Sequence, residues 1–165
     1  MALPRVVNAS PLILLGKIRQ LELLEVGGHE VVIPDAVNRE VADARGLGPL
    51  SGWDPSLSPM RRHDDVPVPP ELLCHALASG ESMVLAQTLS LATTGNDVEV
   101  VLEEKRGRRA AQALGLRLVG TAGLLVIAKA TGRIERITPL LDQVEEAGMY
   151  LGDALRKVIL DVADE

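Results

Sequence analysis

Four places along the chain carry oxygen-bearing side chains of the kind that hold a hard divalent cation. Mg²⁺ and Mn²⁺ prefer oxygen ligands, usually carboxylates together with water and the phosphate oxygens of a substrate. A cation held in this way activates water and neutralises charge on a phosphorus atom, which is the chemistry of phosphodiester hydrolysis. The residues are Asn8, Glu40, Glu81 and the adjacent pair Glu103 and Glu104.

Each of these side chains also has a purely structural interpretation. Glu40, in the run NREVADAR, could be an exposed helix residue supported by a neighbouring arginine. Glu81 could stabilise a helix N-terminus through the helix dipole, and Glu103 and Glu104 could do the same for the next helix. Asn8 could be a helix cap or turn residue. Residue type alone leaves both interpretations open.

The elements that would position these residues alternate between strand and helix. Short β-branched or leucine-rich runs predict strands, and amphipathic runs between them predict helices. Ser10-Pro11 is typical of a helix start, and a second helix is expected after Pro34. Strands are expected at about 4–8, 30–33, 97–102 and 116–119, and further helices at about 11–26, 70–77, 81–93, 104–115, 120–132, 138–147 and 151–162.

This alternation predicts the fold class and the location of a site. Strands that alternate with helices imply right-handed crossovers and a parallel sheet with helices on both faces, a Rossmann-like α/β arrangement. In such sheets functional residues gather at the carboxyl ends of the strands. The rule selects Asn8, after the first strand, and Glu103 and Glu104, after the third.

Length and composition favour one domain. A chain of 165 residues, 47% of them hydrophobic, can bury a full core, and without Phe that core is aliphatic. The glycine- and proline-rich stretch 46–70 predicts a long loop with a short edge strand near 59–63, and a terminal helical pair is expected over 138–162. We expect a single domain over 1–165.

Charge and cysteine content narrow the class of protein. The net charge of −6 argues against non-specific nucleic-acid binding through overall charge. The single Cys74 cannot form an internal disulfide and suits a reducing cytoplasm. No apolar run is long enough for a membrane span, and no signal pattern is present, so a cytoplasmic protein without membrane contact is expected. A nucleotide-binding regulatory domain is a distant alternative because no phosphate loop is present.

A basic cluster directly follows the acidic pair. It could grip RNA phosphates near a metal, helped by a helix N-terminus, or it could be a solvated basic face. The scarcity of aromatic residues predicts that RNA contacts depend mainly on phosphates and shape. The cluster consists of Lys105, Arg106, Arg108 and Arg109.

The order of motifs over nearly the whole chain resembles a PIN-like domain family of prokaryotes, related to VapC toxins. The segments that carry the resemblance are VVNASPLILLGKIRQLELL, EVVIPDAVNREV, SGESMVLAQTLSL, LEEKRGRRAAQALGLRLVGTAGLLVIAKATGRI and PLLDQVEEAGMYLGDALRKVILDVADE. The resemblance implies a three-layer α/β sandwich. It also implies a metal-dependent ribonuclease, often a toxin restrained by a small antitoxin.

The resemblance assigns roles to individual residues. Glu40, Glu81 and Glu104, with Glu103 beside it, correspond to acids of the family, and Ser10 corresponds to a hydroxyl that supports the family's first acid. The family's first acid is replaced by Asn8, and its Asp-Asp pair by two glutamates, each one methylene longer. Asn8 brings no charge, which lowers the expected affinity for Mg²⁺ or Mn²⁺.

Two functions follow as hypotheses. The first is a Mg²⁺- or Mn²⁺-dependent endoribonuclease, the toxin of a toxin–antitoxin pair, with RNA and an antitoxin as partners. The second is a catalytically degenerate PIN-fold protein that binds RNA or a protein. A homodimer is also expected, with Leu12, Ile13 and the helix near 121–130 either at its interface or in the core.

Overall fold

A five-stranded parallel sheet forms the centre of the computed structural model, which describes residues 2–44 and 60–165. The strand order is β3-β2-β1-β4-β5. All four predicted strands are present, as is the edge strand near 59–63. Residues 46–59 of the predicted 46–70 loop lie outside the described residues. The strands are β1 Leu3–Val7, β2 His29–Pro34, β3 Arg61–His63, β4 Glu99–Val101 and β5 Arg117–Val119.

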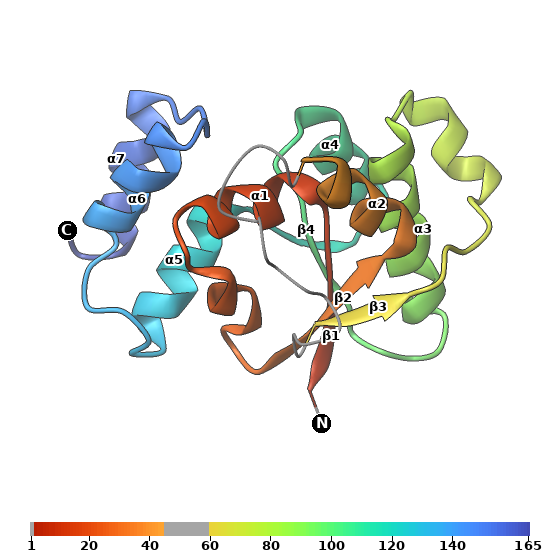
Figure 1. The fold of residues 1–165 in the computed structure, drawn as a ribbon, viewed down its shortest axis with the longest axis horizontal. Helices are drawn as coiled ribbons and strands as arrows, with labels where there is room; N and C mark the ends of the chain where they lie inside the picture. The colour runs from red at the N-terminus through yellow and green to blue at the C-terminus, as the bar shows by residue number, and fades with distance from the viewer. Residues whose placement is uncertain (1, 45–59) are drawn as a thin grey trace.

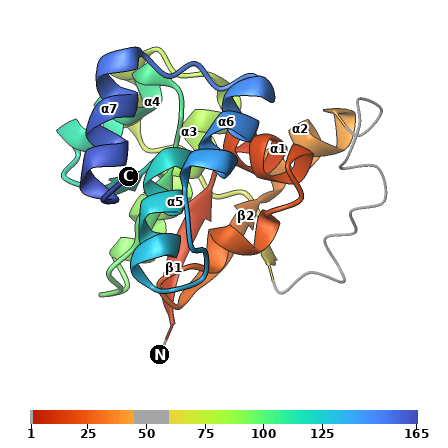
Figure 2. The same cartoon turned by 90° about the vertical axis from the view of Figure 1, so that its left-hand side faces the viewer.

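Helices cover both faces of this sheet (Figure 1). Helix α3 packs against β1, β2 and β4, with α4 beside it. Helices α5, α6 and α7 pack together on the side away from α3 (Figure 2). The α-helices are α1 Ala9–Lys17, α2 Asp35–Ala44, α3 Ser79–Ala92, α4 Lys105–Ala113, α5 Thr121–Ala130, α6 Thr138–Glu146 and α7 Asp153–Val162.

Strand β1 is the centre of the topology. It pairs in parallel with β2 on one side and with β4 on the other. Val6 and Val7 are fully buried, as expected for a strand covered on both faces. Successive connections lead outward to β2 and β3 on one side and to β4 and β5 on the other. The carboxyl ends of β1 and β4 therefore flank the topological switch point, where ligands bind in open α/β sheets.

The predicted helix over 11–26 is wrong in its second half. Helix α1 ends at Lys17, Arg19 adopts a left-handed conformation with φ of 57°, and a separate 3-10 helix, η1, covers Leu21–Glu25. The break lets η1 pack against β2 and buries Leu23 and Leu24. The predicted helix over 70–77 is also a 3-10 helix, η3, at Pro70–His75.

A buried arginine, Arg5, fastens η1 to the sheet. Arg5 on β1 and Glu99 on β4 are register partners, and Arg5 Nε donates to Glu99 Oε1 at 2.6 Å. The Arg5 guanidinium also donates to the carbonyl oxygens of Leu24 at 2.6 Å and Val26 at 2.9 Å. Because Arg5 is fully buried, these partners are needed to offset its loss of hydration.

The C-terminal helices are fastened to α5 by Glu165. Its carboxylate accepts hydrogen bonds from the backbone N–H groups of Ile137 and Thr138 at the start of α6, and from Lys129 Nζ at 2.8 Å. These contacts hold the pKa of Glu165 far below its usual value, chiefly through the Lys129 hydrogen bond. Within residues 2–44 and 60–165, no helix is long and apolar enough to cross a membrane.

Candidate active site

Asn8 and Glu104 meet at the switch point although they are far apart in sequence. Asn8 precedes α1 and Glu104 precedes α4, so each occupies the N-cap position of a helix. Asn8 Nδ2 donates to Glu104 Oε2 at 3.0 Å, and Ser10 Oγ donates to Glu104 Oε1. The side chain of Asn8 makes no capping hydrogen bond. Its amide instead orients a carboxylate, which the interpretation as a plain helix cap does not explain.

The side-chain carbonyl oxygen of Asn8 takes no part in these hydrogen bonds. Asn8 Oδ1 is buried and has no hydrogen-bond partner among the described residues. A buried acceptor without a protein partner costs free energy, so this oxygen is suited to accept from water or to bind a cation. Gly80 lines the same space: a methyl group at this position would lie 2.7 Å from Glu40 Oε2 and 3.6 Å from Asn8 Oδ1. Absence of a side chain at Gly80 thus allows Glu40 to approach Asn8.

Glu40 extends from α2 toward this space and is exposed. Its pKa is raised above the usual value, first by partial loss of hydration and then by the negative charges of Glu104 and Glu81. Glu104 and Glu81 are distant from Glu40 in sequence but act on its charge. The three carboxylates therefore share one electrostatic environment, even though they come from different helices.

Glu81 is buried, and both of its oxygens are engaged by backbone N–H groups. Oε2 accepts from Ala78 at 3.0 Å, just before α3, and Oε1 accepts from Gly107 at 3.1 Å, in the first turn of α4. These donors are among the N–H groups that a helix N-terminus leaves without an internal partner. Glu81 therefore joins the N-termini of α3 and α4. In this structure its carboxylate has the structural role considered for it, stabilisation of a helix N-terminus.

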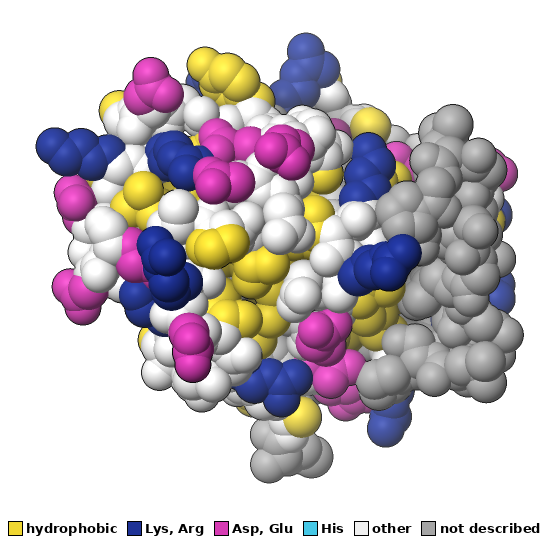
Figure 3. Space-filling view, turned by 60° about the vertical axis from the view of Figure 1, so that its left-hand side comes forward, with side chains coloured by type: hydrophobic (Ala, Val, Ile, Leu, Met, Phe, Trp, Pro, Cys, Tyr) yellow, Lys and Arg dark blue, Asp and Glu magenta, His cyan; other side chains and the backbone are white. Residues whose placement is uncertain are grey.

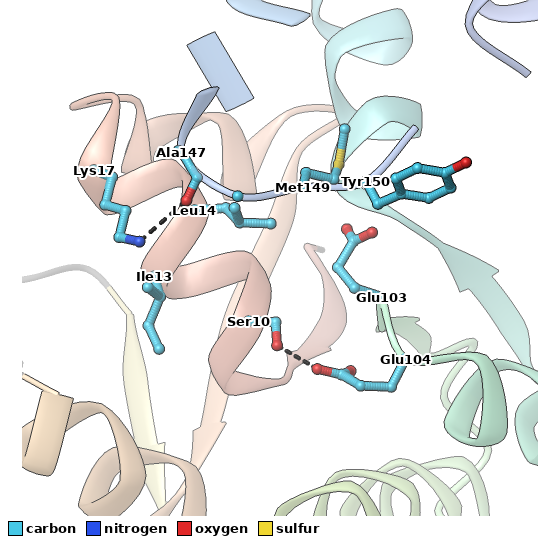
Figure 4. A pocket seen from close by; sticks show the side chains of 10 residues that line it. Ser10, Ile13, Leu14, Lys17, Glu103, Glu104, Ala147, Met149 and Tyr150 are labelled. Atoms are coloured by element: carbon cyan, nitrogen blue, oxygen red, sulfur yellow. Dashed lines mark hydrogen bonds between the residues drawn. The ribbon is translucent and has the colours of Figure 1, made fainter. Parts of the chain in front are cut away.

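Glu103 points away from Asn8. Its Oε1 accepts a hydrogen bond from the backbone N–H of Thr121, the first residue of α5. Figure 4 shows Glu103 directed toward Met149 and Tyr150, whereas Glu104 is directed toward Ser10. The structure therefore brings Asn8, Ser10, Glu40, Glu81 and Glu104 together and leaves Glu103 at the side of this group.

The oxygen atoms at this site suit a hard cation. Because Asn8 is neutral, they carry less negative charge than a set made only of carboxylates. Within the described ranges 2–44 and 60–165, no group of three or more His, Cys, Asp or Glu side chains is arranged to hold a metal ion. Asn8 contributes a neutral amide oxygen, and both Glu81 oxygens accept hydrogen bonds from backbone N–H groups. The free Asn8 Oδ1, with Glu104 and Glu40 nearby, still forms an all-oxygen set of the kind that Mg²⁺ and Mn²⁺ prefer.

The basic cluster divides between anchored and exposed side chains. Arg106 donates to the carbonyl of Ala76 at 3.3 Å, and Arg108 donates to the carbonyl of Leu102 at 2.8 Å. Each guanidinium has further N–H groups. Lys105, Arg106 and Arg109 are exposed, and Arg108 is half-buried. The cluster begins α4 beside Glu104, as the sequence indicates.

Two hollows lie beside the acidic group. The larger, of about 590 Å³, is lined by Ser10, Lys17, Glu103 and Glu104, with residues of the loop between α6 and α7 (Figure 4). The second, of about 380 Å³, is lined by Glu103, Arg108 and the same loop. Apolar side chains are exposed between acidic and basic groups on the face that Figure 3 shows. This loop is not among the site residues predicted from the sequence, although GMYLG between two predicted helices is a signal for it.

The residues considered for a dimer interface lie mostly in the core. Leu12, Leu124 and Leu125 are buried within the chain itself, so a second copy could not cover them. Ile13 is only partly buried and lines the larger hollow.

The fold and the site define a class: an open parallel α/β sheet with an acidic group at its topological switch point. A family model described as a PIN domain matches residues 4–165. The chain belongs to the PIN domain family, a nuclease-type family whose members generally use divalent metal ions. The family resemblance and the three-layer α/β fold expected from the sequence are thus confirmed. No curated protein matches the chain, and no solved structure matches it.

Proposed function

We propose that this protein is a divalent-metal-dependent endoribonuclease. The observation that carries the proposal is the unpartnered, buried Asn8 Oδ1 beside Glu104 and Glu40 at the switch point of a PIN fold. This oxygen set suits Mg²⁺ or Mn²⁺, and the nuclease-type family supplies the class of reaction.

Each residue near the site has a distinct task in the proposed reaction. Asn8 and Ser10 orient the Glu104 carboxylate by hydrogen bonds to its two oxygens. Glu104, Glu40 and Asn8 Oδ1 would hold the cation. Glu81 fixes the N-termini of α3 and α4 against each other, which positions Glu104 at the start of α4.

Hydrolysis requires water to attack a phosphorus atom of the RNA backbone. A bound cation supplies charge neutralisation on the phosphate and activation of water. The oxygen of the water forms a bond to phosphorus, the bond to the leaving ribose oxygen breaks, and that oxygen takes up a proton from solvent. The proton that the water releases would pass to solvent, to which the Glu40 side of the group is exposed. Arg108 and Lys105 would bind flanking phosphates.

A second candidate function is a PIN-fold protein that binds RNA or a protein without cutting. The hydrogen bond between Asn8 and Glu104 favours it, because the amide satisfies the carboxylate without any cation. Glu81 likewise has both oxygens engaged by backbone N–H groups. In this case the acidic group serves the fold alone.

Calorimetric titration with Mn²⁺ separates the two functions. We expect weak binding by the natural protein, tighter binding by Asn8→Asp and loss of binding in Glu40→Gln. Glu22→Gln, which removes an exposed charge from η1, is the matched control. Cleavage of labelled single-stranded RNA should follow the same order. Binding and cleavage only after Asn8→Asp would support the second function instead.

The biological setting is part of the same proposal. We infer that the nuclease acts in the cytoplasm as the toxin of a toxin–antitoxin pair, supported by the resemblance to VapC-related proteins, and that it forms a homodimer. Expression of the chain alone should arrest growth, and Glu40→Gln should relieve the arrest. Growth that is unaffected by a protein active on RNA in vitro would contradict the toxin role. A monomer in sedimentation velocity would contradict the dimer.

A further inference from the structure

Tyr150 stands between the two hollows beside the acidic group. It lines both of them, together with Met149 and Glu103. Figure 4 shows its ring next to Glu103, on the side of the site opposite Ser10. Its side chain is 93% exposed. An aromatic ring is thus held open to solvent at the edge of the site.

The backbone of this loop is fastened in place. Lys17 Nζ donates to the carbonyl of Ala147 at 3.1 Å, which ties the loop to α1. Met149 N donates to the carbonyl of Val144 at 3.0 Å, at the end of α6. Gly148 between them has φ of 118°, a backbone conformation that side chains disfavour, so the turn that presents Tyr150 depends on glycine. These contacts fix the backbone on the N-terminal side of an exposed aromatic ring.

Each of the two hollows that Tyr150 lines also contains a cationic side chain. Lys17 lines the larger hollow and Arg108 lines the smaller one. Each hollow therefore combines a cation, the Glu103 carboxylate and the aromatic ring. A single strand of nucleic acid presents complementary groups, with phosphates on either side of an unpaired base.

We propose that Tyr150 is a stacking platform for an unpaired RNA base next to the phosphate that is cut. The inference rests on the proposed function, since it takes RNA as the ligand. It also answers a difficulty of that function: with a net charge of −6, the protein cannot rely on overall attraction to phosphate. Stacking is insensitive to charge and accepts any base, so it makes the site selective for single strands without selecting a sequence.

Only one tyrosine is present in the sequence, which allows a direct test. Replacing tyrosine by 3-fluorotyrosine gives a single ¹⁹F resonance from position 150. The labelled protein is titrated in EDTA, which prevents cleavage, with a short single-stranded oligoribonucleotide and with an abasic oligomer of equal length. We expect the resonance to shift with the base-bearing oligomer and to stay in place with the abasic one.

Variants measure the contribution to affinity. Tyr150→Ala should raise the Kd for the oligomer at least about tenfold, since one stacked base contributes on that scale. Tyr150→Phe, which keeps the ring, should stay within about twofold of the natural protein. Leu73→Ala, at another exposed apolar residue, is the control and should leave Kd unchanged. The salt dependence of Kd should be unaltered in Tyr150→Ala and reduced in Arg108→Gln, because only the arginine contacts phosphate.

The two proposals fail in different ways. Equal shifts with both oligomers, no shift with either, or an unchanged Kd in Tyr150→Ala would overturn the stacking platform while Mn²⁺-dependent cleavage could still stand. Base-dependent shifts in a protein that never cleaves RNA would support the platform and reject the nuclease.

Discussion

The side-chain amide of Asn8 donates to the carboxylate of Glu104 at 3.0 Å, across a separation of 96 residues in sequence. A carboxylate at position 8 would repel Glu104 unless a cation lay between them. The amide removes that repulsion, so the group at the switch point is stable without metal. The same substitution lowers the negative charge available to a cation. Stability of the empty site and affinity for metal are therefore opposed at position 8.

Asn8→Asp should lower the stability of the metal-free protein and raise its affinity for metal. In EDTA the variant loses the hydrogen bond to Glu104 and gains a like charge, so we expect the free energy of unfolding to fall by about 1–3 kcal/mol. Mn²⁺ at 100 times its Kd should restore about 2.7 kcal/mol. Thermal unfolding followed by circular dichroism, with and without Mn²⁺, measures both effects. Gln143→Glu, the same exchange at an exposed site on α6, should show neither; an equal response there would assign the effect to net charge.

The raised pKa of Glu40 predicts a pH-dependent cost to the fold. Because the folded pKa lies above the unfolded value, the charged form disfavours the folded state, and stability falls as pH rises through the folded pKa. Glu40→Gln should therefore be more stable than the natural protein near pH 7 and equal to it below the ordinary glutamate pKa. The gain should be under about 1 kcal/mol, since the side chain is exposed.

Urea unfolding from pH 3.5 to 7.5 tests the Glu40 prediction. A difference between natural protein and Glu40→Gln that is constant across this range would show that burial of a polar group, rather than its charge, sets the effect. Added Mn²⁺ at neutral pH should remove the advantage of the variant, because a cation would stabilise only the natural carboxylate.

Glu81→Ala should destabilise the fold strongly. It leaves the buried backbone N–H of Gly107 without its acceptor, at about 1–3 kcal/mol, and the partly buried N–H of Ala78 without its acceptor, at a smaller cost. In a chain of this size a loss of about 2–4 kcal/mol lowers the unfolding midpoint by roughly 5–15 °C. Differential scanning calorimetry provides the measurement. Glu71→Ala, at an exposed glutamate of η3, is the control.

The unfolding midpoint of Glu81→Ala distinguishes a structural role of Glu81 from a role as a metal ligand. A midpoint close to that of the natural protein would contradict the role in joining α3 and α4. Loss of Mn²⁺ binding with unchanged stability would then indicate a direct metal ligand.

Glu165 should stabilise the C-terminal helices in a pH-dependent way. Its folded pKa lies far below the unfolded value, so its contribution is present at neutral pH and declines as pH falls below the ordinary glutamate pKa. Glu165→Gln should lower the unfolding midpoint at pH 7, and the difference from the natural protein should shrink toward pH 3. Glu135→Gln, an exposed neighbour of α6, serves as control. A difference that grows on acidification would contradict the assignment.

Much of the fold was predictable because its signals are local. Val6-Val7, the β-branched run before Pro34 and the run before Glu103 identify buried strands, and their alternation with helices implies the parallel sheet. The early end of α1 was not predictable in this way. Leu21 and Leu24 continue the helical period, but packing of η1 against β2 and the hydrogen bonds from Arg5 favour a break at Arg19.

The sequence by itself determined which oxygen-bearing side chains follow the strands, and hence that Asn8, Glu103 and Glu104 would reach one edge of the sheet. Only the tertiary structure decided what each does. Glu104 turns to Asn8, while Glu103 turns to the N-terminus of α5. The choice depends on which backbone N–H groups and side chains other elements bring within hydrogen-bond distance, and no local pattern encodes that.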